Sequence, residues 1–198
     1  MSDHRGSAAQ ATMRRCLGEH LEVHQRLLQE PLDALAYLVD VLVAAFGAGR
    51  KVVLFGNGGS AADAQHVAAE LVNRFLLERD ALPAIALTTN TSILTSVSND
   101  TAFDQVFARQ VRALVQEGDV AVGISTSGNS PSVLEGIRAA KEQGAVTVGL
   151  TGRSGGQLKE LAALCICAPS DHTPRIQEAH ITIWHVVCEA VEQELFGA

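Results

Sequence analysis

Short apolar runs alternate with helical segments from residue 51 onward, and this alternation restricts the fold more than any other feature of the chain. The runs are rich in β-branched and aliphatic residues, which favour buried strands. Strands joined by crossover helices form parallel sheets with helices on both faces. We therefore predict an α/β fold, a three-layer sandwich around a five-stranded parallel sheet. The expected strands are 51–55, 83–87, 119–124, 145–150 and 164–168.

The segments between and after these strands carry helical spacing of apolar residues, with glycine or proline at several of their ends. They are long enough to cross from one strand to the next. The last of them closes the chain. The expected helices are 61–77, 91–98, 103–116, 131–143 and 174–195, with a short one opened by Gly155-Gly156.

Two further helices are expected before the first strand. Apolar residues recur at helical spacing from Leu17 to Leu28, and Pro31 ends that segment. A second apolar helix follows and stops at Gly47-Ala48-Gly49. Because these helices precede the sheet, they need a surface to pack on, and we expect that surface to be a subunit interface.

The length of 198 residues suits one α/β domain with a substantial core and is too short for two comfortable ones. We therefore treat residues 1–198 as a single domain. Residues 1–49 are expected to form an N-terminal helical hairpin for oligomer packing, and residues 50–198 the α/β core.

Two loops rich in glycine and hydroxyl groups each leave an expected strand and enter a helix. They are Gly56-Asn57-Gly58-Gly59-Ser60 and Ser125-Thr126-Ser127-Gly128-Asn129-Ser130, the second followed by Pro131. Serine before proline is typical of an N-cap followed by the first helical position. Glycines let the backbone approach a ligand, and a helix start offers free N–H groups. Since both loops leave the carboxyl ends of strands, we expect a cradle for a small anion or a sugar.

The formal net charge of −7 argues against general attraction to nucleic acid or to an anionic membrane. A phosphorylated ligand would then be held by local dipoles and hydroxyl groups. The N-terminus leads into no apolar signal core, and Asp40 interrupts the longest apolar helical stretch. The four cysteines form no CxxC pattern and suit reduced surroundings. We expect a cytoplasmic protein.

Four side chains could form a metal site. His66 and Glu70 are four residues apart on one expected helix and so share a face, and Gln177 and His185 are eight apart on the last helix. Two imidazoles, a carboxylate and an amide oxygen suit zinc or another divalent ion. The same spacing also suits an ordinary surface pair of histidine and glutamate.

Asn99-Asp100 follows a stretch rich in threonine and serine after the second expected strand. Asparagine and aspartate are common at the end of a helix and in turns. Alternatively, Asp100 lies at the carboxyl edge of the sheet and reaches a sugar hydroxyl or an acid/base position. The residues leave both interpretations open.

These motifs resemble the sugar isomerase (SIS) family, and within it the isomerases of phosphorylated heptoses. The likeness covers nearly the whole chain and is carried by 55–66, 99–100, 124–130 and 175–180. It implies flavodoxin-like winding of the sheet and a homotetramer with one zinc ion per subunit. It also implies conversion of sedoheptulose 7-phosphate to D-glycero-D-manno-heptose 7-phosphate through an enediol. That reaction leads to ADP- or GDP-heptose for the lipopolysaccharide core or another surface glycan.

The resemblance also implies roles for single residues. Zinc would be held by His66, Glu70, Gln177 and His185, and the acid/base pair would be Glu70 and His185. Because a glutamate that binds zinc firmly is a poorer base, we expect its ligation to be weak or exchangeable. Substrate would contact Asn57, Gly58, Gly59, Ser60, Glu70, Asn99, Asp100, Ser125, Thr126, Ser127, Ser130 and Gln177, with the phosphate on the four residues of the second loop.

Two other functions compete with this one. A non-enzymatic relative in the same family binds the bacterial replication initiator, and this chain resembles it at 73–75 and 82–87. That relative has no histidine at the position of His185, whereas this chain keeps all four metal-type residues, which favours the enzyme. A phosphosugar-sensing regulatory domain would need a DNA-binding domain, which this short acidic chain lacks.

Overall fold

Five parallel strands form one sheet in the computed structural model, which describes residues 3–29 and 32–197. The strand order is β2-β1-β3-β4-β5, and every neighbouring pair is parallel. This is the order of a flavodoxin-like doubly wound sheet, so the predicted architecture is confirmed. The strands are β1 (Val52–Gly56), β2 (Ala84–Ala86), β3 (Val120–Ile124), β4 (Val146–Thr151) and β5 (Leu164–Cys167).

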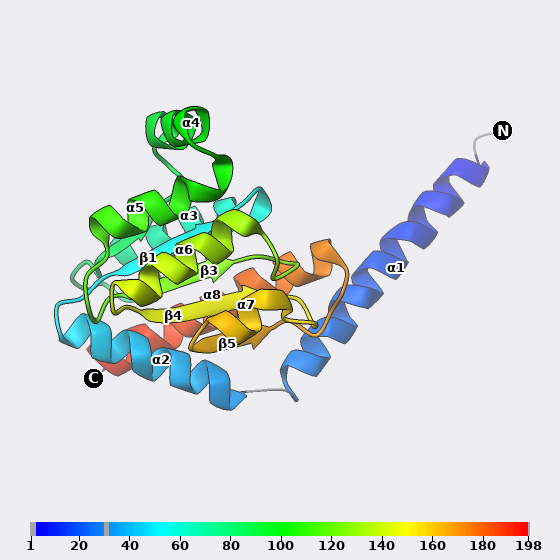
Figure 1. The fold of residues 1–198 in the computed structure, drawn as a ribbon. Coiled ribbons are helices and arrows are strands. Elements are labelled where there is room, and N and C mark those ends of the chain that lie inside the picture. The colour runs from blue at the N-terminus through cyan, green and yellow to red at the C-terminus, as the bar shows by residue number, and fades with distance from the viewer. Residues whose placement is uncertain (1–2, 30–31, 198) are drawn as a thin grey trace.

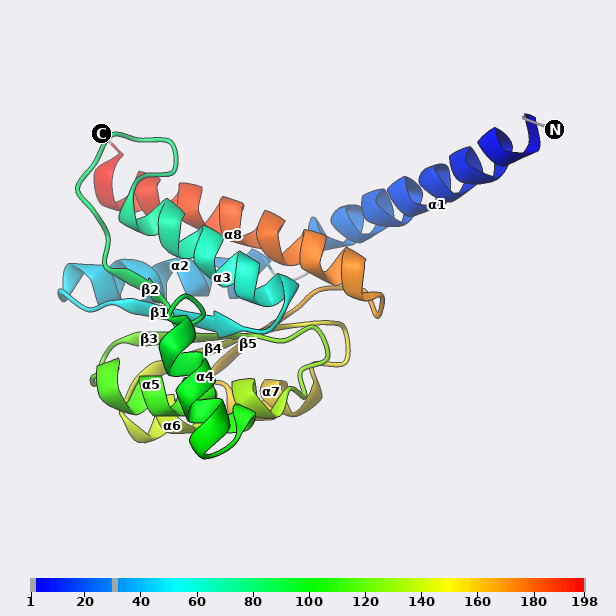
Figure 2. The same ribbon diagram turned by 90° about the horizontal axis from the view of Figure 1, so that it is seen from above.

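Helices cover both faces of the sheet and give three layers, as seen from above in Figure 2. Alternate residues of each inner strand point to opposite faces, so β1 and β3 supply apolar side chains to both layers. One face carries α2 (Leu32–Gly47), α3 (Gly59–Val72) and α8 (Thr173–Phe196), and the other carries α5 (Val106–Leu114), α6 (Pro131–Glu142) and α7 (Gly156–Leu161).

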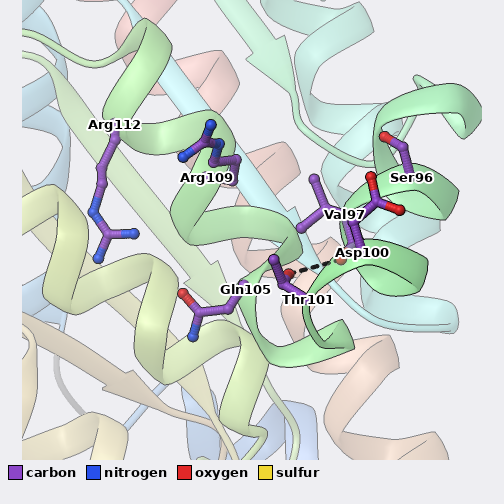
Figure 3. Close-up of a pocket in the computed structure, with 7 residues that line it drawn as sticks. All are labelled: Ser96, Val97, Asp100, Thr101, Gln105, Arg109 and Arg112. Atoms are coloured by element: carbon purple, nitrogen blue, oxygen red, sulfur yellow. Dashed lines mark hydrogen bonds between the residues drawn. The ribbon is translucent and has the colours of Figure 1, made fainter.

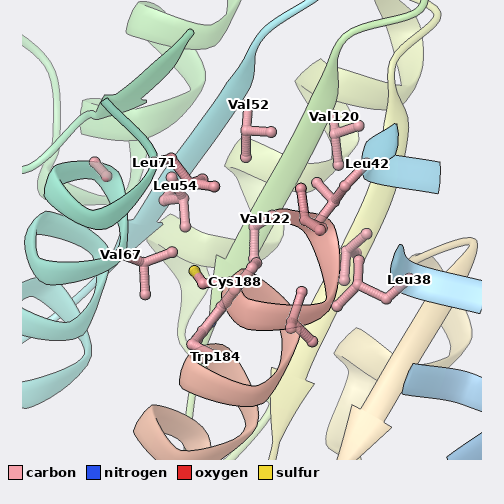
Figure 4. Packing of buried hydrophobic residues seen from close by; sticks show 14 of the residues in the cluster. Leu38, Leu42, Val52, Leu54, Val67, Leu71, Val120, Val122, Trp184 and Cys188 are labelled. Carbon is pink, nitrogen blue, oxygen red and sulfur yellow. The ribbon is translucent and has the colours of Figure 1, made fainter. Parts of the chain in front are cut away.

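The larger core lies under α2, α3 and α8. Trp184 of α8 is fully buried there and packs in one cluster with Val67 of α3, Val122 of β3 and Leu38 of α2 (Figure 4). Burial of each such side chain contributes roughly 1.5–3 kcal/mol. The core therefore holds α3 and α8 firmly on the same face of the sheet.

Two helices stand out from the layers. The first half of α1 (Asp3–Leu27) projects away from the body, while its second half packs on α8 (Figure 1). Among the described residues, α2 begins near the end of α1 and leads away from it, so the two helices do not lie along each other as a hairpin (Figures 1 and 2). Their use in oligomer packing stays a prediction. The other helix, α4 (Thr91–Asp100), contacts α5 and has no buried residue.

Two expected helices have different bounds. The helix expected over 61–77 ends at Val72: the Asn73 amide still donates to the Ala69 carbonyl, but the amides of Phe75 to Leu77 donate to the Glu192 carboxylate instead of to helix carbonyls. The segment 103–116 consists of a short 3-10 turn, η1 (Phe103–Gln105), followed by α5. The helix α5 ends early because the Gln116 amide donates to Asp119, the residue before β3.

In the described part of the chain, no helix combines the length and the hydrophobicity that a membrane crossing requires.

A glycine in α6 permits close packing of that helix on β1. A Cβ atom added at Gly136 would lie 2.6 Å from the Phe55 ring. We therefore expect Gly136→Ala to lower the free energy of unfolding by about 1–3 kcal/mol, as overpacked cores do. Urea denaturation measures this. Gly47→Ala is the control, since nothing lies within 4 Å of the added Cβ atom there. An equal effect of both substitutions would contradict the packing argument.

Candidate active site

Both loops lie at the carboxyl edge of the sheet, next to each other. They follow β1 and β3, which are hydrogen-bonded neighbours. After β1 the chain enters α3 on one face, and after β3 it enters α6 on the other, so the loops flank a topological switch point, where doubly wound folds bind ligands. The Asn57 amide donates to Ser132 Oγ of α6 over 3.0 Å. The first loop thus contacts the start of the helix that the second loop enters.

Hydroxyl groups gather inside the second loop. Ser125 Oγ donates to Ser130 Oγ over 3.0 Å and lies 3.4 Å from Ser127 Oγ. Ser130 occupies the predicted N-cap position of α6, with Pro131 next, but its hydroxyl makes no capping bond and bonds to Ser125 instead. Thr126 is half-buried in the same loop. Hydroxyl groups beside a helix start suit a phosphate.

Both loops need glycine in the left-handed region of backbone space. Gly58 has φ +57° and Gly128 has φ +66°. At Gly128 an added Cβ atom would also lie 2.0 Å from the Gly155 carbonyl oxygen. The shape of the second loop therefore depends on the absence of a side chain at Gly128.

An open groove of about 400 Å³ runs between the loops and the start of η1. Asn57 lines it from the first loop and Ser130 from the second. Ser60, also a predicted contact, is buried below the first loop, where its amide donates to the Asn57 carbonyl over 3.1 Å. The remaining lining residues are Ala102, Phe103, Asp104, Pro131 and Ser132.

Three of the four predicted metal ligands converge. His66 Nε2 lies 3.1 Å from Glu70 Oε1 on α3 and 3.1 Å from His185 Nε2 on α8. One ligand atom from each residue lies within 4.8 Å of those of the other two. Two imidazole nitrogens and a carboxylate oxygen, partly open to solvent, are the donor set of a catalytic zinc site. The residues present therefore fit a divalent metal.

Gln177, the fourth predicted ligand, lies at the first loop. It precedes His185 by eight residues, about 12 Å along the helix axis. A Cβ atom added at Gly59 would lie 2.3 Å from Gln177 Nε2. The Gln177 amide thus packs on the backbone of Gly59, and Gly58 and Gly59 are exposed beside it. Its role as a metal ligand stays a prediction.

Sequence reasoning missed two neighbours of the metal-type cluster. The ring of Phe75 lies against His185, with centroids 5.4 Å apart. Asp63 has a buried carboxylate oxygen without a hydrogen-bond partner, and burial raises the pKa of Asp63 to about 6, while His66 acts in the opposite direction. Asp63 precedes His66 by three residues, so helical spacing could have revealed it.

Asn99 and Asp100 lie at the end of α4, where the Asn99 amide donates to Asp100 over 2.9 Å. Both are exposed. Asp100 lines a separate groove of about 390 Å³ with Gln105 and with Arg109 and Arg112 of α5 (Figure 3). Within one chain, then, the structure does not bring Asp100 into the groove beside Asn57, and substrate contact by this pair stays a prediction.

Comparison with known proteins places these features in a family. The family described as SIS domain matches residues 17–152. The chain is 54% identical to a phosphoheptose isomerase of Geobacter metallireducens over 180 residues, 91% of this chain and 95% of that protein. It is also 54% identical to a phosphoheptose isomerase of a Roseiflexus species, covering 89% of each.

Solved structures agree with the sequence relatives. The phosphoheptose isomerase from Neisseria gonorrhoeae superposes with a TM-score of 0.89 at 38% identity, over 93% of this chain and 99% of that one. The enzyme from Francisella tularensis gives a TM-score of 0.90 at 34% identity, over 93% of this chain and 98% of that one.

The second loop generates a prediction about anion binding. We expect Gly128→Ala to weaken binding of inorganic phosphate by roughly tenfold or more, because the displaced loop loses hydrogen bonds to a charged ligand. Isothermal titration calorimetry measures this. Gly118→Ala is the matched control, since Gly118 also has a positive φ, +84°, but lies in the turn that precedes β3. Equal losses in both variants would show that the loop is not the anion site.

Proposed function

Since this chain belongs to the SIS domain family, we propose that it is an isomerase converting sedoheptulose 7-phosphate to D-glycero-D-manno-heptose 7-phosphate. One observation carries the proposal. The chain is 54% identical to a phosphoheptose isomerase over 91% of its residues, and its His66, Glu70 and His185 converge. These relatives offer no support for the alternative, a protein that binds the replication initiator.

The second loop would hold the phosphate. Its hydroxyl groups at Ser125, Ser127 and Ser130 and the start of α6 suit an anion, although the chain is acidic overall. Thr126 belongs to the same set. Asn57, Gly58 and Gly59 of the first loop would then contact the sugar chain, which runs from the phosphate toward α3.

Isomerisation moves the carbonyl group from C2 to C1. A proton leaves C1 to give an enediol, and a proton is then delivered to C2. The Glu70 carboxylate is suited to take the first proton, and the His185 imidazole to act as the acid, since an imidazolium can donate a proton. Their ligand atoms lie within 4.8 Å of one another, so both can act on adjacent atoms of one substrate.

We propose one zinc ion per subunit as the cofactor. His66, Glu70 and His185 would hold it, with Gln177 as the predicted fourth ligand. Zinc, when bound, supplies positive charge that stabilises negative charge developing on substrate oxygens. His66 and His185 would also orient the substrate hydroxyls relative to Glu70.

The proposed setting is the cytoplasm, where the product would enter ADP- or GDP-heptose synthesis for lipopolysaccharide or another surface glycan. The proposed partners are the phosphorylated seven-carbon sugar and further copies of this chain. A neighbouring subunit in a tetramer would account for Asn99 and Asp100, which lie outside the groove of their own chain. The negative charge opposes nucleic-acid and membrane partners.

Replacing the proposed base tests the reaction. We expect the zinc-loaded protein to produce aldoheptose phosphate from sedoheptulose 7-phosphate, and Glu70→Gln to slow turnover by roughly 100- to 10,000-fold. Phosphosugar binding should remain measurable, since the phosphate loop is intact. Turnover is followed by chromatography of the sugar phosphates. Glu142→Gln, exposed at the end of α6, is the control. Unchanged turnover in Glu70→Gln would exclude Glu70 as the base.

The exposed apolar residues of α1 generate a prediction about assembly. Met13, Leu17 and Leu21 are each more than 60% exposed, an arrangement typical of a subunit interface. Light scattering at micromolar concentration should give about four times the chain mass of 20.9 kDa. Leu21→Glu should reduce the mass, whereas Leu114→Glu, on exposed α5 surface, should not. A monomeric unmodified protein would contradict the tetramer.

A further inference from the structure

One buried carboxylate holds the loop that follows α3. Glu192 of α8 is 1% exposed. Its two oxygens accept hydrogen bonds from the backbone amides of Phe75, Leu76 and Leu77, at 2.7, 2.8 and 2.9 Å. They also accept from Arg79 Nε, at 2.7 Å. Four donors therefore converge on a single side chain, and none of them belongs to the helix that carries it.

The first arm of this arrangement leads to His185. The His185 ring has two ring neighbours: the centroid of Phe75 is 5.4 Å away at an interplanar angle of 30°, and that of His66 is 5.3 Å away. Glu192 holds the backbone amide of Phe75, and therefore the position from which the Phe75 ring reaches His185. His185 and Glu192 are seven residues apart, two turns on one face of α8.

The second arm leads to Glu70. Arg79 Nη2 donates to the Glu70 carbonyl oxygen over 2.9 Å, and Arg79 Nη1 donates to the Leu71 carbonyl oxygen over 2.9 Å. These carbonyls belong to the last turn of α3, which has no intrahelical partner for them. Arg79 is itself paired with Glu192, and its side chain is only 1% exposed. The end of α3, including Glu70, is thus tied to α8 through one ion pair.

From these contacts we propose that Glu192 is a positioning residue for the reaction, setting His185 through Phe75 and Glu70 through Arg79. It touches neither the substrate groove nor the metal-type cluster. The inference rests on the proposed function, because it assigns Glu192 a task in aligning the acid, the base and the metal ligands of that site. Outer residues that orient metal ligands commonly matter nearly as much as the ligands themselves.

The four hydrogen-bond donors around residue 192 require a charged carboxylate. A glutamine at 192 would offer only one oxygen acceptor. Its NH₂ group is a donor and would face other donors in place of the second carboxylate oxygen. The four hydrogen bonds also hold the pKa of Glu192 at about 2, although burial opposes this. Breaking a buried ion pair by removing one partner is costly, because the other charge is left without a partner.

Four variants of the zinc-loaded protein test the inference, one of them the Phe75→Tyr rescue described below. Glu192→Gln removes the charge while keeping the shape, and Phe75→Leu removes only the ring that contacts His185. Glu189→Gln is the matched control, an exposed glutamate on the same helix. The measurements are zinc affinity by competition with a chelator, kcat and KM for sedoheptulose 7-phosphate, and folding by circular dichroism.

We expect Glu192→Gln to lower zinc affinity and kcat by roughly 10- to 100-fold. KM should change less than about threefold, because the substitution leaves the second loop, which would hold the phosphate, unchanged. Phe75→Leu should lower kcat and zinc affinity as well, and Phe75→Tyr, which keeps the ring, should restore both. Glu189→Gln should match the unmodified protein.

Unchanged zinc affinity and kcat in folded Glu192→Gln would overturn the inference, as would equal losses in Glu189→Gln. If Glu192→Gln fails to fold, Phe75→Leu decides: reduced zinc affinity with normal folding supports the inference, and unchanged values overturn it. Failure of the unmodified protein to bind zinc and to isomerise the sugar would instead refute the proposed function.

Discussion

The contact between α3 and α8 is the one on which the candidate site depends. Both helices pack on the same sheet face and run in the same direction (Figure 2). Gly59 therefore faces Gln177, His66 faces His185, and Glu192 lies beyond the end of α3. Neither helix has enough ligands to hold a metal by itself. The apolar burial of Trp184 and its neighbours brings the polar side chains together.

The order of the strands brings the two loops of the candidate site to one edge of the sheet. Because β1 and β3 are neighbours, both loops lie at the same edge of the sheet, and the first loop contacts the start of α6. A phosphate in the second loop would lie near one end of the sugar, and the metal-type cluster would lie farther along α3. The acidic net charge is compatible with this arrangement, since the attraction is local. In the proposed function, the fold would thus separate binding of the anion from the chemistry of the carbonyl group.

Much of the fold could be predicted because apolar spacing reflects burial. The five strands and the strand-to-helix loops follow directly from that spacing. The end of α3 could not be predicted, because Glu192, more than a hundred residues away, competes for the amides of Phe75 to Leu77. The divergence of α1 and α2 is also tertiary, since α1 packs on α8. Asp63 could have been found from its spacing to His66, whereas Phe75 could not.

By itself the sequence determined which residues can bind and which can react: the glycines that permit tight loops, the hydroxyl groups beside them, and the pairs His66–Glu70 and Gln177–His185. Only the tertiary structure decided which of these meet. It joined His66, Glu70 and His185, set Gln177 against Gly59, and left Asp100 in another groove. The physical reason is that helical periodicity orients a side chain on its own helix, whereas the distance between helices is set by packing across the whole core.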